Sequence, residues 1–331
     1  MKEMPIIQTV LGPINSELLG VTLTHEHIIC DAGLCKSNRD RKDKLPWGSY
    51  MWFDEIPTMI DEVRIFKEDG GNGIVEVTCH GWGRDPYALR EISEKTGVHI
   101  VASTGFYVED CMPPWVSQLS VDQLSAWVQR EILVGCTALS DDKITDIRAG
   151  IIKTSLSRPH FCGDELKCVK AVAKAHLKTG APITSHSSGS IRFEIEGGNA
   201  GIQLLELLED EGVDPEALIV GHADENPDID NLVMLVKRGA WIQFDTIGKQ
   251  QYISDEARAD LVIKMKERGL LDHLLLSQDR NRKPELHKYG GPGYSDLMNR
   301  FLPLLKNKGI TDKDIRVILV DNPRKALAMR F

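Results

Sequence analysis

The segment "GVTLTHEH", from Gly20 to His27, places two histidines at the end of an apolar run. In a β-strand, side chains at positions i and i+2 point to the same face. We therefore expect His25 and His27 to project together, with Glu26 pointing away from them. Two imidazoles on one face are either half of a metal site or two surface residues that happen to be close, and the rest of the chain decides between these interpretations.

The same kind of strand recurs along the chain. Short runs rich in β-branched residues alternate with stretches of helical periodicity, such as 164–179, 201–211 and 255–268. The last stretch follows a capping residue, Ser254 or Asp255, and ends before Gly269. The other runs that we predict as strands begin at Gly73, His99, Ala149, Ala181, Ala217, Ala240 and His273.

Eight strand-and-helix units in 331 residues predict a (β/α)8 TIM barrel. No linker rich in proline or serine divides the sequence, so we expect residues 1–331 to form a single domain. The alternative is an open, doubly wound sheet. The phosphate-binding signatures GxGxxG and GxxxxGK[ST] that would support such a sheet do not occur in the sequence.

The composition excludes several classes of protein. A net charge of −9 argues against a nucleic-acid partner, and no apolar run approaches the roughly 18 residues that span a membrane. The amino-terminal residues do not read as a signal peptide. The cysteines are odd in number and include no CxxC pair, so we expect free thiols and a cytoplasmic location. They are Cys30, Cys35, Cys79, Cys111, Cys136, Cys162 and Cys168.

Chemically active side chains stand at the carboxyl ends of the predicted strands, where barrels of this kind build their active sites. A lone histidine at a strand end is more often structural than a ligand. When several such residues are expected at one rim, a role as ligands becomes the better interpretation. They are His25, His27, Lys153, His186, His222 and Asp279.

Lys153 follows the apolar run "AGII" and should be largely buried. Burial disfavours the ammonium form, so the amine becomes neutral and nucleophilic near pH 7. A neutral amine can add CO2 to form a carbamate, which acts as a carboxylate and can bridge two metal ions. The alternative is a salt bridge to an acid such as Asp279.

"TLTHEH", the isolated Lys153, "SH" at His186, "GH" at His222 and Asp279 resemble the phosphotriesterase-like lactonases of the amidohydrolase superfamily. The likeness extends to "RKPELHKYGGPGY" (residues 282–294) and to "DNPRKAL" near the carboxyl end. The resemblance implies a binuclear metal centre with a carbamylated lysine. One metal would be held by His25, His27 and Asp279, the other by His186 and His222, and both by Lys153.

The resemblance also implies a reaction. A hydroxide that bridges two divalent ions, zinc by first preference or else manganese or cobalt, would attack an ester-like bond. Asp279 would accept the proton and pass it to the leaving alkoxide. Tyr107 matches a tyrosine that points at the substrate carbonyl in similar lactonases; the alternative role is that of an aromatic residue at the barrel rim. We expect a lactone as the substrate.

A basic cluster follows Asp279, and Lys249 follows the seventh predicted strand, where barrel enzymes often bind phosphate. Some members of the family hydrolyse phosphorylated furanose lactones. We therefore predict a phosphate site, although a solvated loop with surface ion pairs is the alternative. The candidate residues are Lys249, Arg280, Arg282 and Tyr289.

Other functions stay open at this point. An N-acyl homoserine lactonase with a phosphotriesterase side activity would need an apolar channel, for which "MPPW" (residues 112–115) offers material. A metal-free barrel that binds a small molecule is an alternative of another class. The expected partner is a small-molecule lactone rather than nucleic acid or membrane, and the sequence is compatible with a homo-oligomer.

Overall fold

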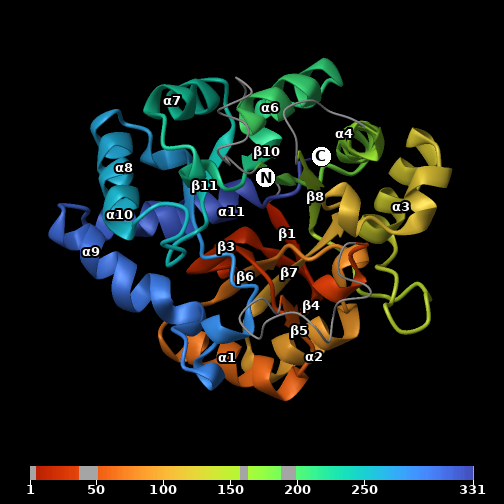
Figure 1. The fold of residues 1–331 in the computed structure, drawn as a ribbon, viewed down its shortest axis with the longest axis horizontal. Coiled ribbons are helices and arrows are strands. Elements are labelled where there is room, and N and C mark those ends of the chain that lie inside the picture. Colours follow the sequence, from red (N-terminus) through yellow and green to blue (C-terminus); the bar gives the residue numbers. More distant parts are fainter. Residues whose placement is uncertain (1–4, 37–50, 157–162, 188–198, 331) are drawn as a thin grey trace.

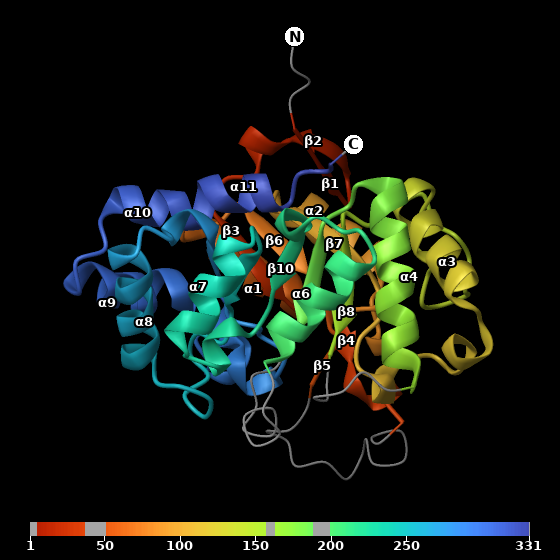
Figure 2. The ribbon, with the colours of Figure 1, turned by 90° about the horizontal axis from the view of Figure 1, so that it is seen from above.

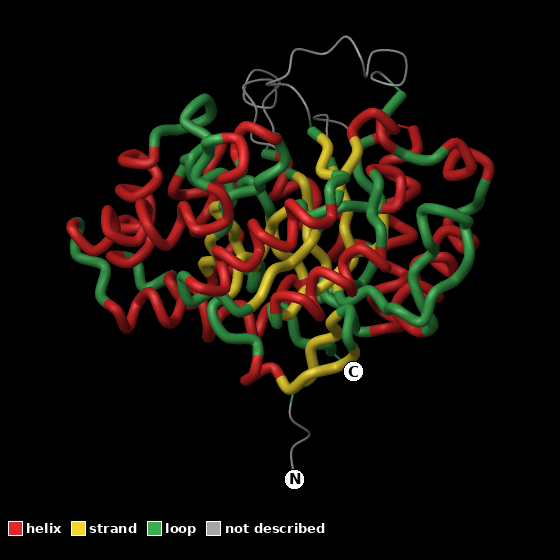
Figure 3. Tube along the Cα trace, turned by 90° about the horizontal axis from the view of Figure 1, so that it is seen from below, coloured by secondary structure: helices red, strands yellow, loops and turns green. Residues whose placement is uncertain are grey.

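A computed structural model describes residues 5–36, 51–156, 163–187 and 199–330 of the chain. Eight parallel strands form a barrel that helices surround (Figures 1 and 3). Each of the eight barrel strands lies within a run predicted from the sequence, so the predicted TIM barrel is confirmed. The strands are β3 (Thr22–Glu26), β6 (Gly73–Glu76), β7 (His99–Gly105), β8 (Ile151–Ser155), β9 (Ile183–His186), β10 (Leu218–Val220), β11 (Trp241–Phe244) and β12 (Leu274–Leu276).

The helices pack on the outside of the barrel (Figure 2). The long ones are α1 (Ile56–Glu68), α2 (Pro86–Thr96), α3 (Val121–Leu133), α4 (Gly163–Thr179), α6 (Ala200–Asp210), α7 (Ile229–Lys237) and α8 (Asp255–Glu267). Three short helices follow near the carboxyl end: α9 (Leu302–Asn307), α10 (Asp312–Arg316) and α11 (Asn322–Ala326). The predicted cap of α8 is confirmed, because the Ser254 hydroxyl accepts a hydrogen bond from the amide of Ala257.

The barrel closes between its first and last strands through Glu26. The amide of Asp279, after β12, donates to the carbonyl of His25 on β3 at 3.1 Å. The Glu26 carboxylate accepts hydrogen bonds from Ser277 Oγ and from the amides of Gln278 and Arg280. Glu26 therefore points into this seam, away from the two histidines, as predicted. Burial raises its pKa to about 7.

Two short hairpins accompany the barrel and were not predicted. Strands β1 (Ile6–Thr9) and β2 (Gly12–Asn15) pair at the end of the barrel where both chain termini lie (Figure 2). Strands β4 (Cys30–Asp31) and β5 (Trp52–Phe53) pair near the opposite rim, where β3 ends. The described part of the chain contains no helix long and apolar enough to cross a membrane.

The expectation of seven free cysteines is wrong, because Cys35 and Cys111 form a disulfide. The two residues are 76 positions apart and lie on different rim segments, so no local spacing could reveal their pairing. Free, buried thiols are found at Cys30, Cys79, Cys136 and Cys168, and Cys162 lies outside the described residues. The disulfide removes the argument for a cytoplasmic location that was based on free thiols.

Candidate metal centre

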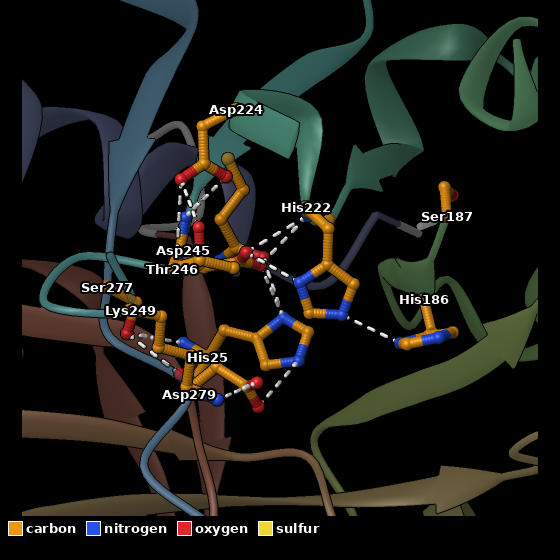
Figure 4. Close-up of polar contacts among 12 residues, drawn as sticks. His25, His186, Ser187, His222, Asp224, Asp245, Thr246, Lys249, Ser277 and Asp279 are labelled. Atoms are coloured by element: carbon orange, nitrogen blue, oxygen red, sulfur yellow. Dashed lines mark hydrogen bonds and ion pairs between the residues drawn. The ribbon is translucent and has the colours of Figure 1, made fainter. Parts of the chain in front are cut away.

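Three buried side chains meet where the first and last strands end. His27 Nε2 lies 3.1 Å from Asp279 Oδ1. His25 Nε2 lies 3.9 Å from the same oxygen (Figure 4). The two histidines project together from β3, as the i, i+2 spacing predicts. Their free nitrogens and the carboxylate are close enough to ligate a single ion.

Two further histidines complete the cluster. His186 ends β9 and His222 follows β10, and His186 Nδ1 lies 2.7 Å from His222 Nε2 (Figure 4). Lys153, from β8, is 1 % exposed, and its Nζ lies 3.1 Å from His25 Nε2. All six side chains predicted to bind metal are therefore brought together at one end of the barrel.

The hydrogen bonds behind the histidines test whether this donor set fits a metal. The Thr78 hydroxyl donates to Glu76, so it accepts from the Nδ1–H of His27 at 2.7 Å. The Nδ1 atoms of His25 and His222 lie 2.8 and 2.7 Å from the two oxygens of Asp245. A proton on each Nδ1 leaves the Nε2 lone pair directed into the cluster, which is the arrangement of metal-ligating histidines. The donor set therefore fits divalent cations.

Asp245 is a residue that the sequence interpretation missed. His25, His222 and Asp245 are also close enough to surround an ion. However, both Asp245 oxygens already accept from the histidines, and the amide of His222 also donates to Asp245 Oδ1 at 3.0 Å. Asp245 is therefore placed to orient the candidate ligands rather than to bind metal itself. It directly follows β11, so the rule that found the other strand-end residues would have found it too.

Burial sets the protonation of most of the cluster. It lowers the pKa of His25 and of His186, and it lowers that of His27 to about 4. It also lowers the pKa of Lys153 to about 8, so a fraction of the amine is neutral near pH 7. These imidazoles and this amine are thus available as lone-pair donors.

The two remaining ligand candidates respond to their charged neighbours. Burial alone would lower the pKa of His222, but the Asp245 carboxylate outweighs it and raises that pKa to about 9. Burial would raise the pKa of Asp279, but Lys249 and His27 hold it well below its usual range. Asp279 is therefore ionised.

The backbone is strained at two of these residues. His222 and Asp279 adopt left-handed conformations, with φ of 56° and 51°. Such conformations are unfavourable for residues other than glycine and concentrate at functional sites. A hydrogen bond of each backbone amide, to Asp245 and to the His25 carbonyl respectively, stabilises them.

Aromatic rings form one wall of the cluster. Tyr107, which follows β7, stacks on Trp82 with ring centroids 5.0 Å apart, and its edge contacts His186 at 5.0 Å. Trp82 in turn contacts the His27 ring at 4.4 Å. Burial raises the pKa of Tyr107, so its hydroxyl stays protonated. Tyr107 therefore lies beside the candidate ligands, as the sequence predicts.

The predicted phosphate-binding residues separate in the structure. Lys249 is 4 % exposed, and its Nζ lies 2.5 Å from Asp279 Oδ2 (Figure 4). The buried Arg280 pairs with Asp296 at 2.5 Å, away from the cluster. The Tyr289 hydroxyl donates to Glu55 at 3.2 Å, and Arg282 is half-buried at the loop. The geometry brings Lys249 to the site but not Arg280 or Tyr289.

Acidic residues from a distant segment neutralise much of the basic loop. Lys283 pairs with Asp54, and Lys288 with Glu55, both just before α1. These acids are more than 200 residues away in the sequence. The apparent excess of positive charge in the sequence is therefore smaller in the fold.

Comparisons with known proteins agree with this geometry. The model of the phosphotriesterase family matches residues 5–327. The chain is similar to the phosphotriesterase homology protein of Escherichia coli, which was solved as a complex with phosphate in the active site. The identity is 32 %, the match covers 94 % of this chain and 99 % of that one, and the TM-score is 0.82. It is also similar to a lactonase from Listeria monocytogenes. The identity is 28 %, the match covers 98 % of this chain and 100 % of that one, and the TM-score is 0.86. An N-acetyltaurine hydrolase from Xenopus tropicalis is 29 % identical over 98 % of both chains.

Proposed function

The chain belongs to the phosphotriesterase family of metal-dependent hydrolases, and on that premise we propose that it opens the ring of a phosphorylated furanose lactone. The observation that carries the proposal is the position of Lys249. This buried cation lies against Asp279, beside the candidate ligands and within reach of a substrate bound there.

The proposed centre holds two divalent ions, zinc by preference and manganese or cobalt as alternatives. In this proposal His25, His27 and Asp279 would hold one ion, His186 and His222 would hold the other, and Lys153, as a carbamate, would be shared by both. The distance of 3.1 Å between Lys153 Nζ and His25 Nε2 supports a place for Lys153 among the ligands. When bound, such ions make water nucleophilic at neutral pH and polarise a carbonyl oxygen.

The protein's own groups then move the protons. Asp279 Oδ1 lies 3.1 Å from His27 Nε2, and Oδ2 accepts hydrogen bonds from Lys249 and Asn281. In this proposal the Asp279 carboxylate would take a proton from the attacking water. Asp279 would then give that proton to the leaving alkoxide. The protonated hydroxyl of Tyr107 would donate a hydrogen bond to the substrate carbonyl.

Charge near the cluster favours an anionic substrate. With the Asp279 carboxylate engaged in holding a metal, Lys249 would offer its positive charge to a phosphate oxygen. The phosphate named in the active site of the Escherichia coli relative supports the same interpretation.

A second candidate is the hydrolysis of N-acetyltaurine, the activity that names the Xenopus relative. Its sulfonate is a tetrahedral anion, so the same lysine would recognise it, with an amide in place of the lactone. An acyl homoserine lactone is less well supported, because Phe106, Trp115 and Trp127 pack against one another beside Tyr107 instead of leaving a channel between them. Membership of a metal-dependent hydrolase family argues against a metal-free binding protein.

A hydrolysis panel tests the proposal. It compares 5-phosphorylated furanose lactones with their unphosphorylated forms, N-acetyltaurine and acyl homoserine lactones, all at the same metal loading. We expect kcat/KM for the phosphorylated lactones to be at least a hundredfold higher, about 2.7 kcal/mol. Fastest turnover of N-acetyltaurine would replace the lactone with an amide. Equal turnover of the acyl lactones would overturn the phosphate site.

A matched pair of variants locates the anion site. Lys249→Met should reduce the preference for phosphorylated over unphosphorylated lactone about tenfold or more, beyond any general loss of kcat. Lys288→Met removes an exposed cation of the neighbouring loop that pairs with Glu55, and it should leave the preference unchanged. The same preference in both variants would contradict the role of Lys249.

A further inference from the structure

Arg258, on α8, is a buried cation that the proposed reaction does not use. It is 0 % exposed. Its Nε donates to Asp224 at 2.6 Å, and its two terminal nitrogens donate to Thr246 Oγ1, at 2.8 Å, and to Asp255. These acceptors come from three segments: the loop after β10, the loop after β11 and the first turn of α8. One guanidinium thus joins three segments behind the ligand cluster.

Asp224 carries this connection toward the histidines. Its carboxylate accepts hydrogen bonds from the amides of Asp245 and Thr246 at 3.3 Å each, and from the Thr246 hydroxyl at 2.6 Å. In Figure 4, Asp224 lies beyond Asp245 as seen from His25. Asp245 is the residue whose two oxygens face the Nδ1 atoms of His25 and His222. Two hydrogen-bonding layers therefore separate Arg258 from the candidate ligands.

Asp255 carries a second connection, toward Lys249. Besides pairing with Arg258, its carboxylate accepts from the amide of Gly248 at 3.1 Å and from the side chain of Gln250 at 2.8 Å. These residues flank Lys249 on both sides. The segment from Asp245 to Gln250 is thus held at its start through Asp224 and at its end through Asp255.

We propose that Arg258 is a positioning residue that sets the metal affinity of the site from α8, by fixing Asp245 and hence the orientation of His25 and His222. This inference rests on the proposed metal ligands. Without Arg258, the buried Asp224 carboxylate loses its counter-charge and cannot keep its place between the loops. A lysine in its place carries the charge but lacks the planar fork that reaches all three acceptors.

The same network explains why Arg280 is not available to a substrate. Arg280 pairs with Asp296, Arg300 joins Asp296 to Asp255, and Asp255 pairs with Arg258. Arginines and aspartates therefore alternate from the segment after β12 to the loop after β10. This network gives the three last loops of the barrel one common support.

The test measures metal binding by Arg258→Met and Arg258→Lys, using Zn²⁺ in competition with a chromophoric chelator and the visible absorption of Co²⁺-loaded protein. We expect zinc affinity to fall about tenfold or more in Arg258→Met, the range found for outer-shell partners, and to recover in part in Arg258→Lys. The control is His176→Leu, which removes a buried imidazole of α4 whose Nδ1 lies 2.8 Å from the carbonyl of Ala181, before β9 and away from the ligand cluster. It should lower Tm and leave zinc affinity unchanged.

Wild-type zinc affinity and Co²⁺ spectra in Arg258→Met would overturn the proposal, as would an equal loss of affinity in His176→Leu. If Arg258→Met does not fold, Thr246→Val removes the hydroxyl that joins Arg258 to Asp224 and should weaken zinc binding severalfold; unchanged affinity there overturns the proposal. The zinc content of the wild type distinguishes a failure of the proposed ligands from a failure of the role proposed for Arg258. Less than about one zinc ion per chain would refute the ligands themselves, whereas two ions with unaffected variants would refute only Arg258.

Discussion

At the scale of single residues, the site depends on which nitrogen each histidine presents. Thr78 takes the Nδ1–H of His27, and Asp245 takes those of His25 and His222. Each of these acceptors is itself fixed. Thr78 donates to Glu76, and Asp245 accepts from the amide of His222 and donates its own amide to Asp224. The cluster is therefore oriented before any ion arrives, and the cost of ordering the ligands falls on folding rather than on binding.

Lys153→Ala tests the bridging carbamate most directly. The variant should lose most bound metal and reduce kcat by a factor of about a thousand or more, since one shared ligand of both ions disappears. Short carboxylates such as acetate, added with metal, should restore part of the activity because they can take the place of the carbamate. Metal content and turnover are measured on the same samples. Full activity in Lys153→Ala would remove the bridging role.

Glu76 gives the metal-free protein a pH dependence. Burial raises the pKa of this carboxyl from 4.5 to about 8, so between these pH values the folded state holds a proton that the unfolded chain has released. The free energy of unfolding should therefore fall as pH rises through this window, by at most about 1.4 kcal/mol per pH unit from this group. Glu76→Gln cannot ionise, so its stability should decline less between pH 5 and pH 8.

Urea unfolding of the metal-free protein at pH 5, 6.5 and 8 measures this effect. Glu256→Gln, at an exposed position of α8, serves as the control and should keep the slope of the wild type. A wild-type slope in Glu76→Gln as well would show that Glu76 does not bind the proton in question.

At the scale of elements, strand positions could be predicted because both faces of each barrel strand are buried. Ile74 of β6 packs in the outer core under the helices, whereas the next residue, Val75, packs in the core inside the barrel. Both neighbours are apolar, which produces the continuous β-branched runs of the sequence. The same rule placed the candidate ligands, since parallel strands bring their carboxyl ends to one rim.

Contacts between distant segments could not be predicted in this way. The pairing of β4 with β5, the disulfide and the acids that neutralise Lys283 and Lys288 all join residues that no local pattern connects. The burial of Arg280 was missed for the same reason, because its partner Asp296 lies 16 residues further along the chain. Residue type indicated charge at the rim, but only the fold decides which charges stay unpaired.

The disulfide supports the aromatic wall of the site. Cys35 and Cys111 lie in one apolar cluster with Trp82, against which Tyr107 packs. Cys35→Ser should lower the free energy of unfolding by roughly 2–4 kcal/mol, as expected when a loop of this length is opened. It should also lower kcat, because the Tyr107 ring loses its support. A dithiol reductant should cause the same changes in the wild type.

Cys168→Ser, which removes a buried free thiol, provides the control and should keep the response to the reductant. Thiol titration of the unfolded, unreduced chain should find two fewer thiols in the wild type than after reduction. If reduction changes neither this number nor Tm, the bond does not form in the protein.

At the scale of the whole molecule, the two ends of the barrel differ in what they do. The candidate ligands occupy the carboxyl ends of the strands. A cavity of about 600 Å³ lies at the amino ends and is lined by Trp241, His273 and residues near the chain termini. None of the candidate ligands lines this cavity. The converging donors, rather than this cavity, therefore mark the candidate site.

We propose that residues 1–331 act as one domain. Thermal unfolding with and without metal tests both this proposal and the metal site. Both ends of the chain join one structure, since the amide of Met329 donates to the carbonyl of Ile6. The protein should therefore unfold in a single calorimetric transition with or without metal. Free zinc at about a hundred times its Kd should add about 2.7 kcal/mol and raise Tm by roughly 4 °C, because only the folded chain assembles the ligands. Two separate transitions would contradict the single domain, and a Tm that does not respond to chelation would contradict the metal site.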